Sequence, residues 1–152
     1  MKLRWAALVV VLALGAFMPA TLTAQSPSQP PSGTSAPVEL GQNYPNPFDL
    51  DTRIPFSVGG PPQCQEQGRL YRVTLRIYNI LSQLVAIPVL QGGSGPTASG
   101  QPLENVLLPC DRYVAYWDGK AQGSTAELAR GIYIYRLEVD GKPYVKRMFL
   151  RK

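Results

Sequence analysis

The chain has 152 residues, about one domain, with 45% apolar residues, 16% charged residues and a formal net charge of +5. It contains 15 Pro, 14 Gly, 8 Tyr and 2 Cys but no His. The missing histidine excludes Ser-His-Asp and Cys-His nucleophiles and imidazole zinc sites, and two cysteines cannot build a four-thiolate site. The composition therefore predicts short strands joined by turns, in a non-enzymatic module without metal or cofactor.

The first 24 residues have the pattern of a secretory signal peptide. A basic start precedes an apolar run at residues 6–18, which is too short for a membrane span of ~20 residues. Cleavage is expected after Ala24, with Ala20 as the second choice and an uncleaved membrane anchor as the alternative. Cleavage lowers the net charge to +3, and we expect neither nucleic-acid binding nor a remaining membrane span.

Residues 25–37 contain only Gln, Ser, Pro, Gly, Thr and Ala, and such a segment has nothing to bury. We interpret it as a linker that either holds a domain away from a surface or forms a frayed end. The folded domain is expected to comprise residues 38–152.

Strand patterns dominate this domain. Residues 69–80 alternate between apolar and polar side chains, as expected for a half-buried strand. Pro55 and Pro88 each suggest a strand at a sheet edge. The best helix candidate, residues 124–129, would form one turn at most. The expected strands lie at residues 52–58, 69–80, 83–90, 113–117, 131–139 and 142–150. The strand at 131–139 is expected at the centre of its sheet. Six or seven short strands at this spacing predict an antiparallel β-sandwich.

Counting strand directions places both cysteines in loops at the same end of the sandwich. Cys64 precedes the strand at 69–80, and the chain returns to that end before Cys110. An intrachain disulfide is the economical interpretation for an exported chain. Two free thiols or a bond between chains are the alternatives.

Several short motifs carry a resemblance to a known family. The chain resembles the type A C-terminal sorting domain of type IX secretion, whose fold is shared with the immunoglobulin-like domain of the flagellar hook-capping protein. The resemblance covers residues 40–152. Its motif residues are Tyr44, Pro45, Asn46, Pro47, Phe48, Tyr78, Asn79, Trp117, Asp118, Gly119, Gly131, Tyr133 and Tyr135, with a candidate sorting strand at Lys146, Arg147, Met148, Phe149, Leu150 and Lys152.

The resemblance implies an immunoglobulin-like sandwich of about seven strands that is secreted or displayed at the cell surface. Family members are usually tails of larger cargo, and the outer-membrane secretion machinery recognises the folded tail. This chain differs in having Ser82 where a turn usually has Gly, Leu50 where Pro is usual, and longer loops at 59–68 and 91–105. Without signal and linker, only the module remains.

The motif residues also have physical interpretations. We expect Tyr44 and Phe48 to plug one end of the sandwich, and Asn46 to hold its own backbone in a turn. Trp117 is expected in the core, with a sugar-stacking platform as the minor alternative. The same core placement, with the hydroxyl group exposed, is expected for Tyr78, Tyr116 and Tyr133.

The charged residues permit two further interpretations. Asp49 and Asp51 are too few ligands for calcium and are expected to cap a turn. The C-terminal cations are expected to prevent edge pairing or to form a recognition patch for the export machinery or an acidic polymer; they are Lys142, Lys146, Arg147, Arg151 and Lys152.

Two functions follow from these observations. The first is an exported immunoglobulin-like module that acts in secretion or cell-surface attachment. The second is a free-standing secreted binding or structural protein, whose long loops at one end contact a protein or glycan partner.

Overall fold

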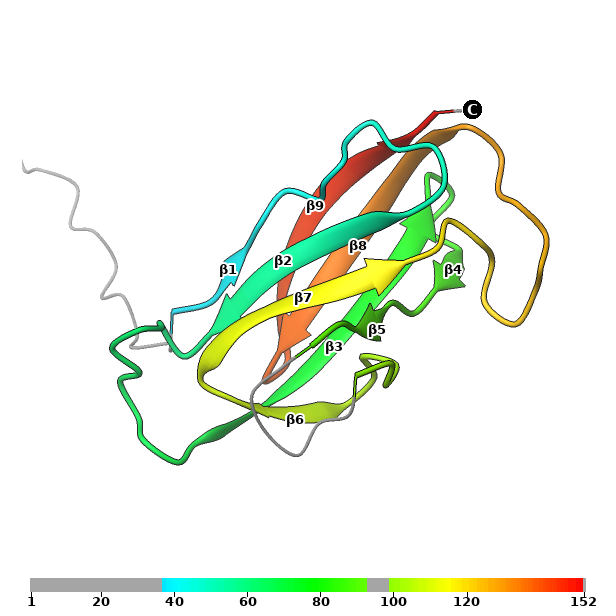
Figure 1. Cartoon of the computed structure of the whole chain (residues 1–152). Coiled ribbons are helices and arrows are strands. Elements are labelled where there is room, and N and C mark those ends of the chain that lie inside the picture. The colour runs from blue at the N-terminus through cyan, green and yellow to red at the C-terminus, as the bar shows by residue number, and fades with distance from the viewer. Residues whose placement is uncertain (1–36, 93–98, 152) are drawn as a thin grey trace, which may run out of the picture. The chain divides into compact units, whose positions relative to one another are not determined.

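The computed structural model describes residues 37–92 and 99–151. The predicted signal peptide, all but the last residue of the linker, and Lys152 lie outside these ranges. Figure 1 shows the described strands, which are β1 (Glu39–Leu40), β2 (Thr52–Val58), β3 (Leu70–Asn79), β4 (Leu84–Ala86), β5 (Val89–Leu90), β6 (Val106–Pro109), β7 (Asp111–Trp117), β8 (Gly131–Val139) and β9 (Lys142–Leu150).

The strands form two sheets that pack face to face. The first sheet has the order β1-β2-β7-β5, and the second has the order β4-β3-β8-β9, with β6 pairing the first half of β3. Every strand pairing is antiparallel. The predicted immunoglobulin-like β-sandwich is confirmed, and seven strands have three or more residues. The described ranges contain no helix, including residues 124–129.

Alternating side chains of both sheets meet in one core. In β3, Tyr71, Val73, Leu75 and Ile77 are buried, as the period of two predicted. Thr74 faces the other way but is also buried, since the chain after β5 covers it. The backbone N–H of Asn105 donates to its hydroxyl at 2.9 Å. β8 lies between β3 and β9, which confirms its predicted central position.

The prediction of one continuous strand at 83–90 is wrong. The segment divides into β4, which pairs with β3 in the second sheet, and β5, which pairs with β7 in the first sheet. Pro88 lies at the crossover, where a residue without an N–H group interrupts a ladder at little cost. Both pieces lie at sheet edges, as Pro88 indicated.

The edge position predicted for β2 is also wrong, because β2 lies between β1 and β7. The carbonyl of Pro55 accepts from Gly41 at 2.8 Å on the β1 side. Pro55 itself has no N–H to donate there, and the ladder with β1 contains only two residue pairs. Sequence analysis also missed β6, a four-residue strand that follows the long loop.

Two turns follow the expected chemistry. Asp140 and Gly141 connect β8 to β9 with φ of 49° and 82°, as a two-residue hairpin turn requires. Ser82 has a φ of 60°, so a serine occupies a position in the left-handed conformation, which glycine adopts at less cost.

Candidate functional site

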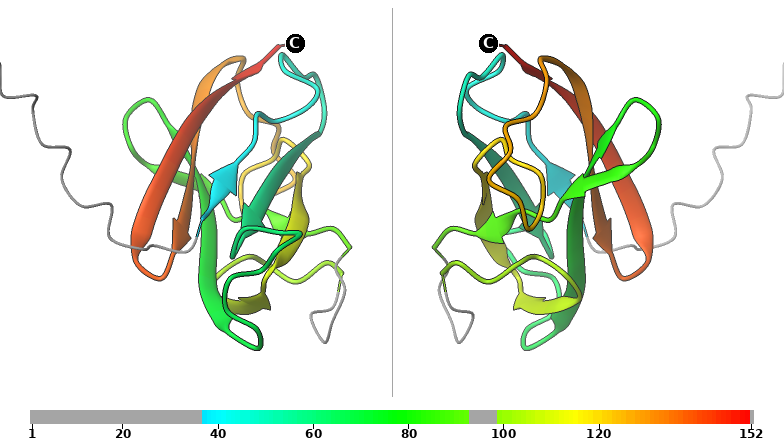
Figure 2. Two further views of the ribbon diagram at one scale, coloured as in Figure 1. Left: turned by 90° about the vertical axis from the view of Figure 1, so that its left-hand side faces the viewer. Right: turned by 90° about the vertical axis from the view of Figure 1, so that its right-hand side faces the viewer.

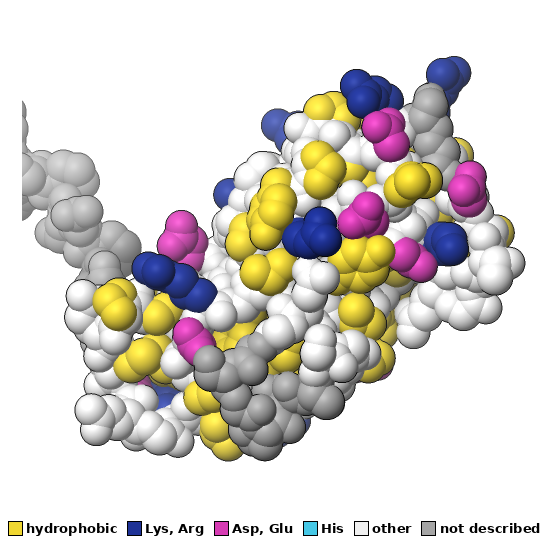
Figure 3. Space-filling model, viewed as in Figure 1, with side chains coloured by type: hydrophobic (Ala, Val, Ile, Leu, Met, Phe, Trp, Pro, Cys, Tyr) yellow, Lys and Arg dark blue, Asp and Glu magenta, His cyan; other side chains and the backbone are white. Residues whose placement is uncertain are grey.

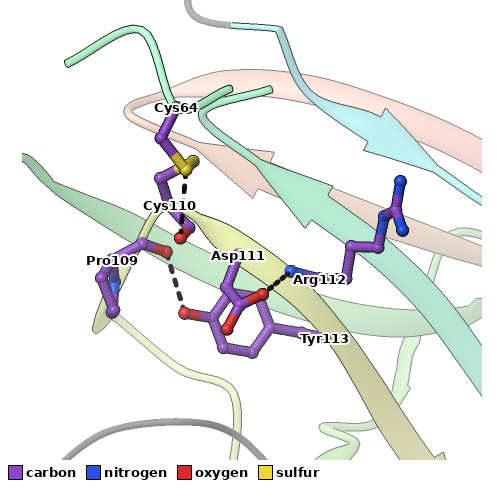
Figure 4. The surroundings of a disulfide bond; sticks show 6 residues. All are labelled: Cys64, Pro109, Cys110, Asp111, Arg112 and Tyr113. Carbon is purple, nitrogen blue, oxygen red and sulfur yellow. Dashed lines mark hydrogen bonds between the residues drawn. A yellow bond between two sulfur atoms is a disulfide. The ribbon is translucent and has the colours of Figure 1, made fainter. Parts of the chain in front are cut away.

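The predicted disulfide is present at one end of the sandwich (Figure 4). Cys64, in the loop between β2 and β3, is bonded to Cys110, between β6 and β7, with 5.7 Å between their Cα atoms. Gly59 packs against this bond, and a Cβ atom there would approach the Cys110 Cβ to 2.7 Å. A disulfide of this kind is typical of proteins in an oxidising compartment.

The strand that leaves the disulfide is fixed by Tyr113. Its hydroxyl donates to the Pro109 carbonyl at 2.8 Å, and its ring stacks on Phe56 at 5.5 Å between centroids. Burial, reinforced by the Asp111 carboxylate, raises the pKa of Tyr113 to about 12. The hydroxyl of Tyr71, also buried, has no hydrogen-bond partner within the described residues.

The opposite end of the sandwich contains most of the residues that carry the sequence resemblance. Phe48 is fully buried and meets Trp117 edge to face, with 5.5 Å between ring centroids. Trp117 in turn meets Tyr133 at 5.7 Å. Phe48 therefore plugs this end as predicted, whereas Tyr44 remains 48% exposed, which contradicts its predicted place in the plug.

The polar groups of these rings are satisfied by nearby backbone. The Trp117 indole donates to the Lys120 carbonyl at 2.9 Å, and the Tyr133 hydroxyl donates to the Ala129 carbonyl at 2.8 Å. The core position predicted for Trp117 is confirmed, and the sugar-stacking alternative does not fit its burial. Tyr133 is buried too, but its hydroxyl is bonded to the protein rather than left to solvent.

The core positions predicted for Tyr78 and Tyr116 are wrong. Both residues are half-buried and alternate with the inward-facing residues of their strands, so their rings lie on the outer faces of the two sheets. The guanidinium of Arg53 lies 5.9 Å from the centre of the Tyr116 ring. Partial burial raises the pKa of Tyr116, with a smaller contribution from Asp51.

A buried hydrogen-bond network joins the motif segment to both sheets. The Asn43 side chain donates to Thr52 Oγ1 at 2.9 Å and to the Pro45 carbonyl at 3.1 Å. The backbone N–H of Asn43 donates to the Tyr135 hydroxyl at 3.2 Å, and that hydroxyl donates to the Gly41 carbonyl at 2.9 Å. Burial raises the pKa of Tyr135, and the hydrogen bond from the backbone N–H of Asn43 lowers it by a smaller amount.

The motif segment also holds the C-terminal strand. The Phe48 amide donates to the Phe149 carbonyl at 3.0 Å, and the Arg151 amide donates to the Phe48 carbonyl at 2.7 Å. Asn46 Oδ1 accepts from the Phe149 amide at 3.0 Å, so Asn46 bonds the distant strand rather than its own turn. We call Asn46, Phe48 and their three bonds to Phe149 and Arg151 the C-terminal clamp.

The two aspartates beside the clamp pair with arginines. Asp49 accepts two hydrogen bonds from Arg151, both at 3.1 Å, and this contact lowers the pKa of the Asp49 carboxyl. Asp51 lies 3.6 Å from Arg53. The expected turn-capping role is therefore replaced by ion pairing in the described chain.

The turns that frame this end need their small residues. Asp118 Oδ1 accepts from the Lys120 amide at 3.1 Å, which closes the turn after β7. Gly119 has a φ of 71°, and a Cβ atom there would collide with the Leu50 carbonyl. Gly131 begins β8 opposite Leu150. Of the remaining motif residues, Pro45 and Pro47 follow cis peptide bonds within the motif segment.

The candidate sorting strand is divided between core and surface. Met148 and Leu150 are buried, whereas Lys146, Arg147 and Phe149 are exposed. β9 is the last strand of the second sheet, as expected for an edge strand rich in cations. The structure therefore presents two cationic side chains and one aromatic side chain on a strand that is fixed from inside.

Sequence analysis assigned no role to Asn43 and Thr52. Their partners lie up to 92 positions away in the chain, and local patterns carry no signal for such a network. A polar residue on the otherwise apolar inward face of a strand, such as Thr52 at the start of β2, is the only hint the sequence offers.

Comparison of the chain with protein-family models, with curated proteins and with solved structures finds no match. Among the described residues, no group of three or more His, Cys, Asp or Glu side chains could hold a metal ion. The same residues include no helix that is long and apolar enough to cross a membrane.

Proposed function

We propose that the chain is an exported, non-enzymatic module that resembles a type IX secretion sorting domain and acts in secretion or cell-surface attachment. The observation that carries this proposal is the C-terminal clamp. The residues that resemble the family near the start of the domain hold the C-terminal strand, which is the candidate sorting element. Two distant parts of the motif thus form one structural unit.

The exposed side chains of β9 are the candidate recognition surface. Because Met148 and Leu150 anchor the strand, the backbone of β9 holds Arg147 and Phe149 on its outer face and Lys146 on the opposite face. A fixed backbone loses little conformational entropy on binding, so the entropic cost is that of ordering the exposed side chains. The partners that we propose are the outer-membrane secretion machinery or, for attachment, a surface protein or glycan.

Export is supported by two independent features. The first 24 residues have the pattern of a signal peptide, and the disulfide between Cys64 and Cys110 fits an oxidising compartment. We therefore propose that the protein is secreted or lies at the cell surface.

A graft tests the sorting function. Residues 38–152 are fused behind a periplasmic reporter in a host with type IX machinery and in a matched strain without the outer-membrane channel. We expect the reporter at the cell surface only where the channel is present. K146Q/R147Q should reduce delivery, whereas Arg72→Gln, an exposed change on β3, should not. Retention of a folded, disulfide-bonded fusion in the periplasm would reject the proposal.

The alternative, a free-standing binding or structural protein, is favoured by one feature of the disulfide end. The loop between β2 and β3 is tied to Cys110 and exposes three glutamines at positions 63, 65 and 67. Amide groups on a restrained loop suit hydrogen bonding to a protein or glycan. Binding of the unfused protein to its host's surface that is lost on changing these glutamines to alanine, but not in K146Q/R147Q, would support this alternative.

A further inference from the structure

The ring of Tyr116, half-buried on the outer face of the first sheet, borders two adjoining hollows. The first hollow has a volume of about 460 Å³, and the second has a volume of about 330 Å³. Tyr116, Asp118 and Lys120 belong to the walls of both. Figure 3 shows this face of the molecule, on which acidic and basic side chains lie among hydrophobic ones. We call the two hollows together the Tyr116 site.

Apolar side chains form one wall of the first hollow. Val89 is the cross-strand partner of Tyr116, and both side chains are partly exposed on the outer face. Ile87, also partly exposed, belongs to the same wall. Ala86 and Trp117 border the hollow as well, but their side chains are buried in the core. A ligand in this hollow would therefore contact chiefly the side chains of Tyr116, Ile87 and Val89.

The loop between β7 and β8 supplies the opposite, polar wall. The right-hand view of Figure 2 faces this loop, which is coloured yellow to orange. Its exposed polar side chains at the hollow are Gln122, Ser124 and Thr125. The backbone N–H of Gln122 donates to the Val85 carbonyl at 2.9 Å, and the Trp117 indole holds the Lys120 carbonyl. These bonds form the wall before any ligand arrives, which lowers the cost of binding.

The polar groups of the Tyr116 site suit a ligand that both donates and accepts hydrogen bonds. The carboxylates of the lining only accept, whereas its hydroxyl and amide side chains donate and accept. The Tyr116 hydroxyl is bonded to no other described residue. Sugars carry many hydroxyl groups on a ring whose C–H groups pack against the negatively polarised face of an aromatic ring. Tyr116 and its surroundings therefore match both sides of a sugar.

The charges of the site favour a neutral sugar over an acidic or a basic one. The charged lining residues are Asp51, Asp118, Lys120 and Glu127. Three acidic groups against one basic group repel an anion. A cation on the ring would instead meet Arg53, whose guanidinium lies 5.9 Å from the ring centre and whose Nε donates to Gln91 Oε1 at 3.1 Å. A neutral ligand avoids both repulsions and can still donate hydroxyl groups to the carboxylates.

We propose that the Tyr116 site binds a neutral oligosaccharide that carries N-acetyl groups. An acetamido group combines a methyl group, which suits Ile87 and Val89, with an N–H and a carbonyl, which suit Gln122 on the facing wall. Each hollow is large enough for one sugar ring, so the two together accommodate more than one. No residue of β9 or of the C-terminal clamp lines the site, so this inference is independent of the sorting function.

Calorimetric titration of the oxidised chain, purified from its host, tests the proposal with triacetylchitotriose as the probe. We expect saturable binding with a dissociation constant on the order of 0.1–1 mM, because open hollows bury only part of a sugar. Cellotriose, which has the same linkage but no acetamido group, should bind at least about fivefold more weakly. Trigalacturonate, an acidic trisaccharide, should bind more weakly still.

Two pairs of variants locate the binding site. Tyr116→Ala should weaken binding at least about tenfold, whereas Tyr78→Ala, which removes a half-buried tyrosine from the outer face of the other sheet, should bind like the wild type. Gln122→Ala should weaken binding about threefold, whereas Gln67→Ala, an equally exposed change in the loop tied by the disulfide, should not. Thermal unfolding checks that the tyrosine variants are folded, and the exposed position of Gln122 makes its variant independent of core packing.

Four results would contradict the proposal. The site is rejected if triacetylchitotriose shows no saturable binding up to about 10 mM, or if folded Tyr78→Ala and Tyr116→Ala weaken binding equally. Loss of binding in Gln67→Ala but not in Gln122→Ala would place the sugar at the disulfide end instead. Preference for trigalacturonate would overturn the neutral ligand, and equal binding of cellotriose would overturn the role of the acetamido group.

Discussion

One end of the sandwich is held by a covalent bond, and the other is held by interlocked rings and buried hydrogen bonds. At the first end, Cys64 and Cys110 join two loops, and Gly59 leaves no room beside the bond. At the second end, Phe48 inserts between the sheets and Asn43 links them through polar contacts. The comparison shows that loops can be restrained either by a cross-link or by burying one short segment.

The largest effect is expected from emptying the plug of the second end. Phe48→Ala removes a fully buried ring and its edge-to-face contact with Trp117. A cavity of that size should lower the free energy of unfolding by about 3–5 kcal/mol. Urea denaturation of the oxidised protein measures the change, with Tyr44→Ala as the control on an exposed ring nearby. Equal effects of the two substitutions would show that Phe48 is not a structural plug.

Breaking the covalent end should cost slightly less. C64S/C110S opens a loop with a sequence separation of 46 and should lower the free energy of unfolding by about 3–4 kcal/mol in the chain-entropy model. Hydrogen exchange distinguishes the two ends, since protection should fall first in the loops beside residues 64 and 110 and remain in the C-terminal clamp. Uniform loss of protection at both ends would mean that the ends are not independent.

The smallest effect at neutral pH is expected for Tyr113→Phe, which removes one hydrogen bond worth about 0.5–1.5 kcal/mol. Its pH dependence is more informative. Because the folded pKa of about 12 exceeds the ordinary tyrosine pKa of 10.0, folding favours the protonated phenol. This stabilisation is complete below pH 10 and is lost as the pH rises toward 12.

The free energy of unfolding, measured by urea denaturation at steps from pH 9 to pH 12, should therefore fall more steeply in the wild type than in Tyr113→Phe. Tyr133→Phe serves as the comparison at the other end, where burial also raises the pKa of the phenol. Parallel curves for the wild type and Tyr113→Phe would contradict the assigned shift.

Strands with a clear alternation could be predicted from the sequence to within a residue. β8 and β9 have the predicted bounds because side chains on a strand alternate between core and solvent. The same rule failed at residues 83–90, where the chain changes sheets at Pro88. Which sheet a short strand joins depends on partners far along the chain, so local periodicity carries no information about it.

The candidate site was predicted in part. The disulfide followed from strand counting, and the burial of Phe48 was expected from its predicted place as a plug. The clamp could not be predicted, because Asn46 and Phe149 are 103 positions apart. Asn46 can bond either its own turn or a distant amide, and only the tertiary fold decides between these two partners.

The C-terminal clamp also determines how another chain could approach β9. The backbone groups that face away from β8 belong to alternate residues, which are Pro143, Val145, Arg147 and Phe149. Pro143 has no N–H, the Arg147 carbonyl accepts from Gln42 at 3.1 Å, and both groups of Phe149 are bonded to the clamp. An incoming strand would find a continuous ladder only around Val145. Any partner that selects this edge must therefore recognise its side chains, because too little free backbone remains for an added strand.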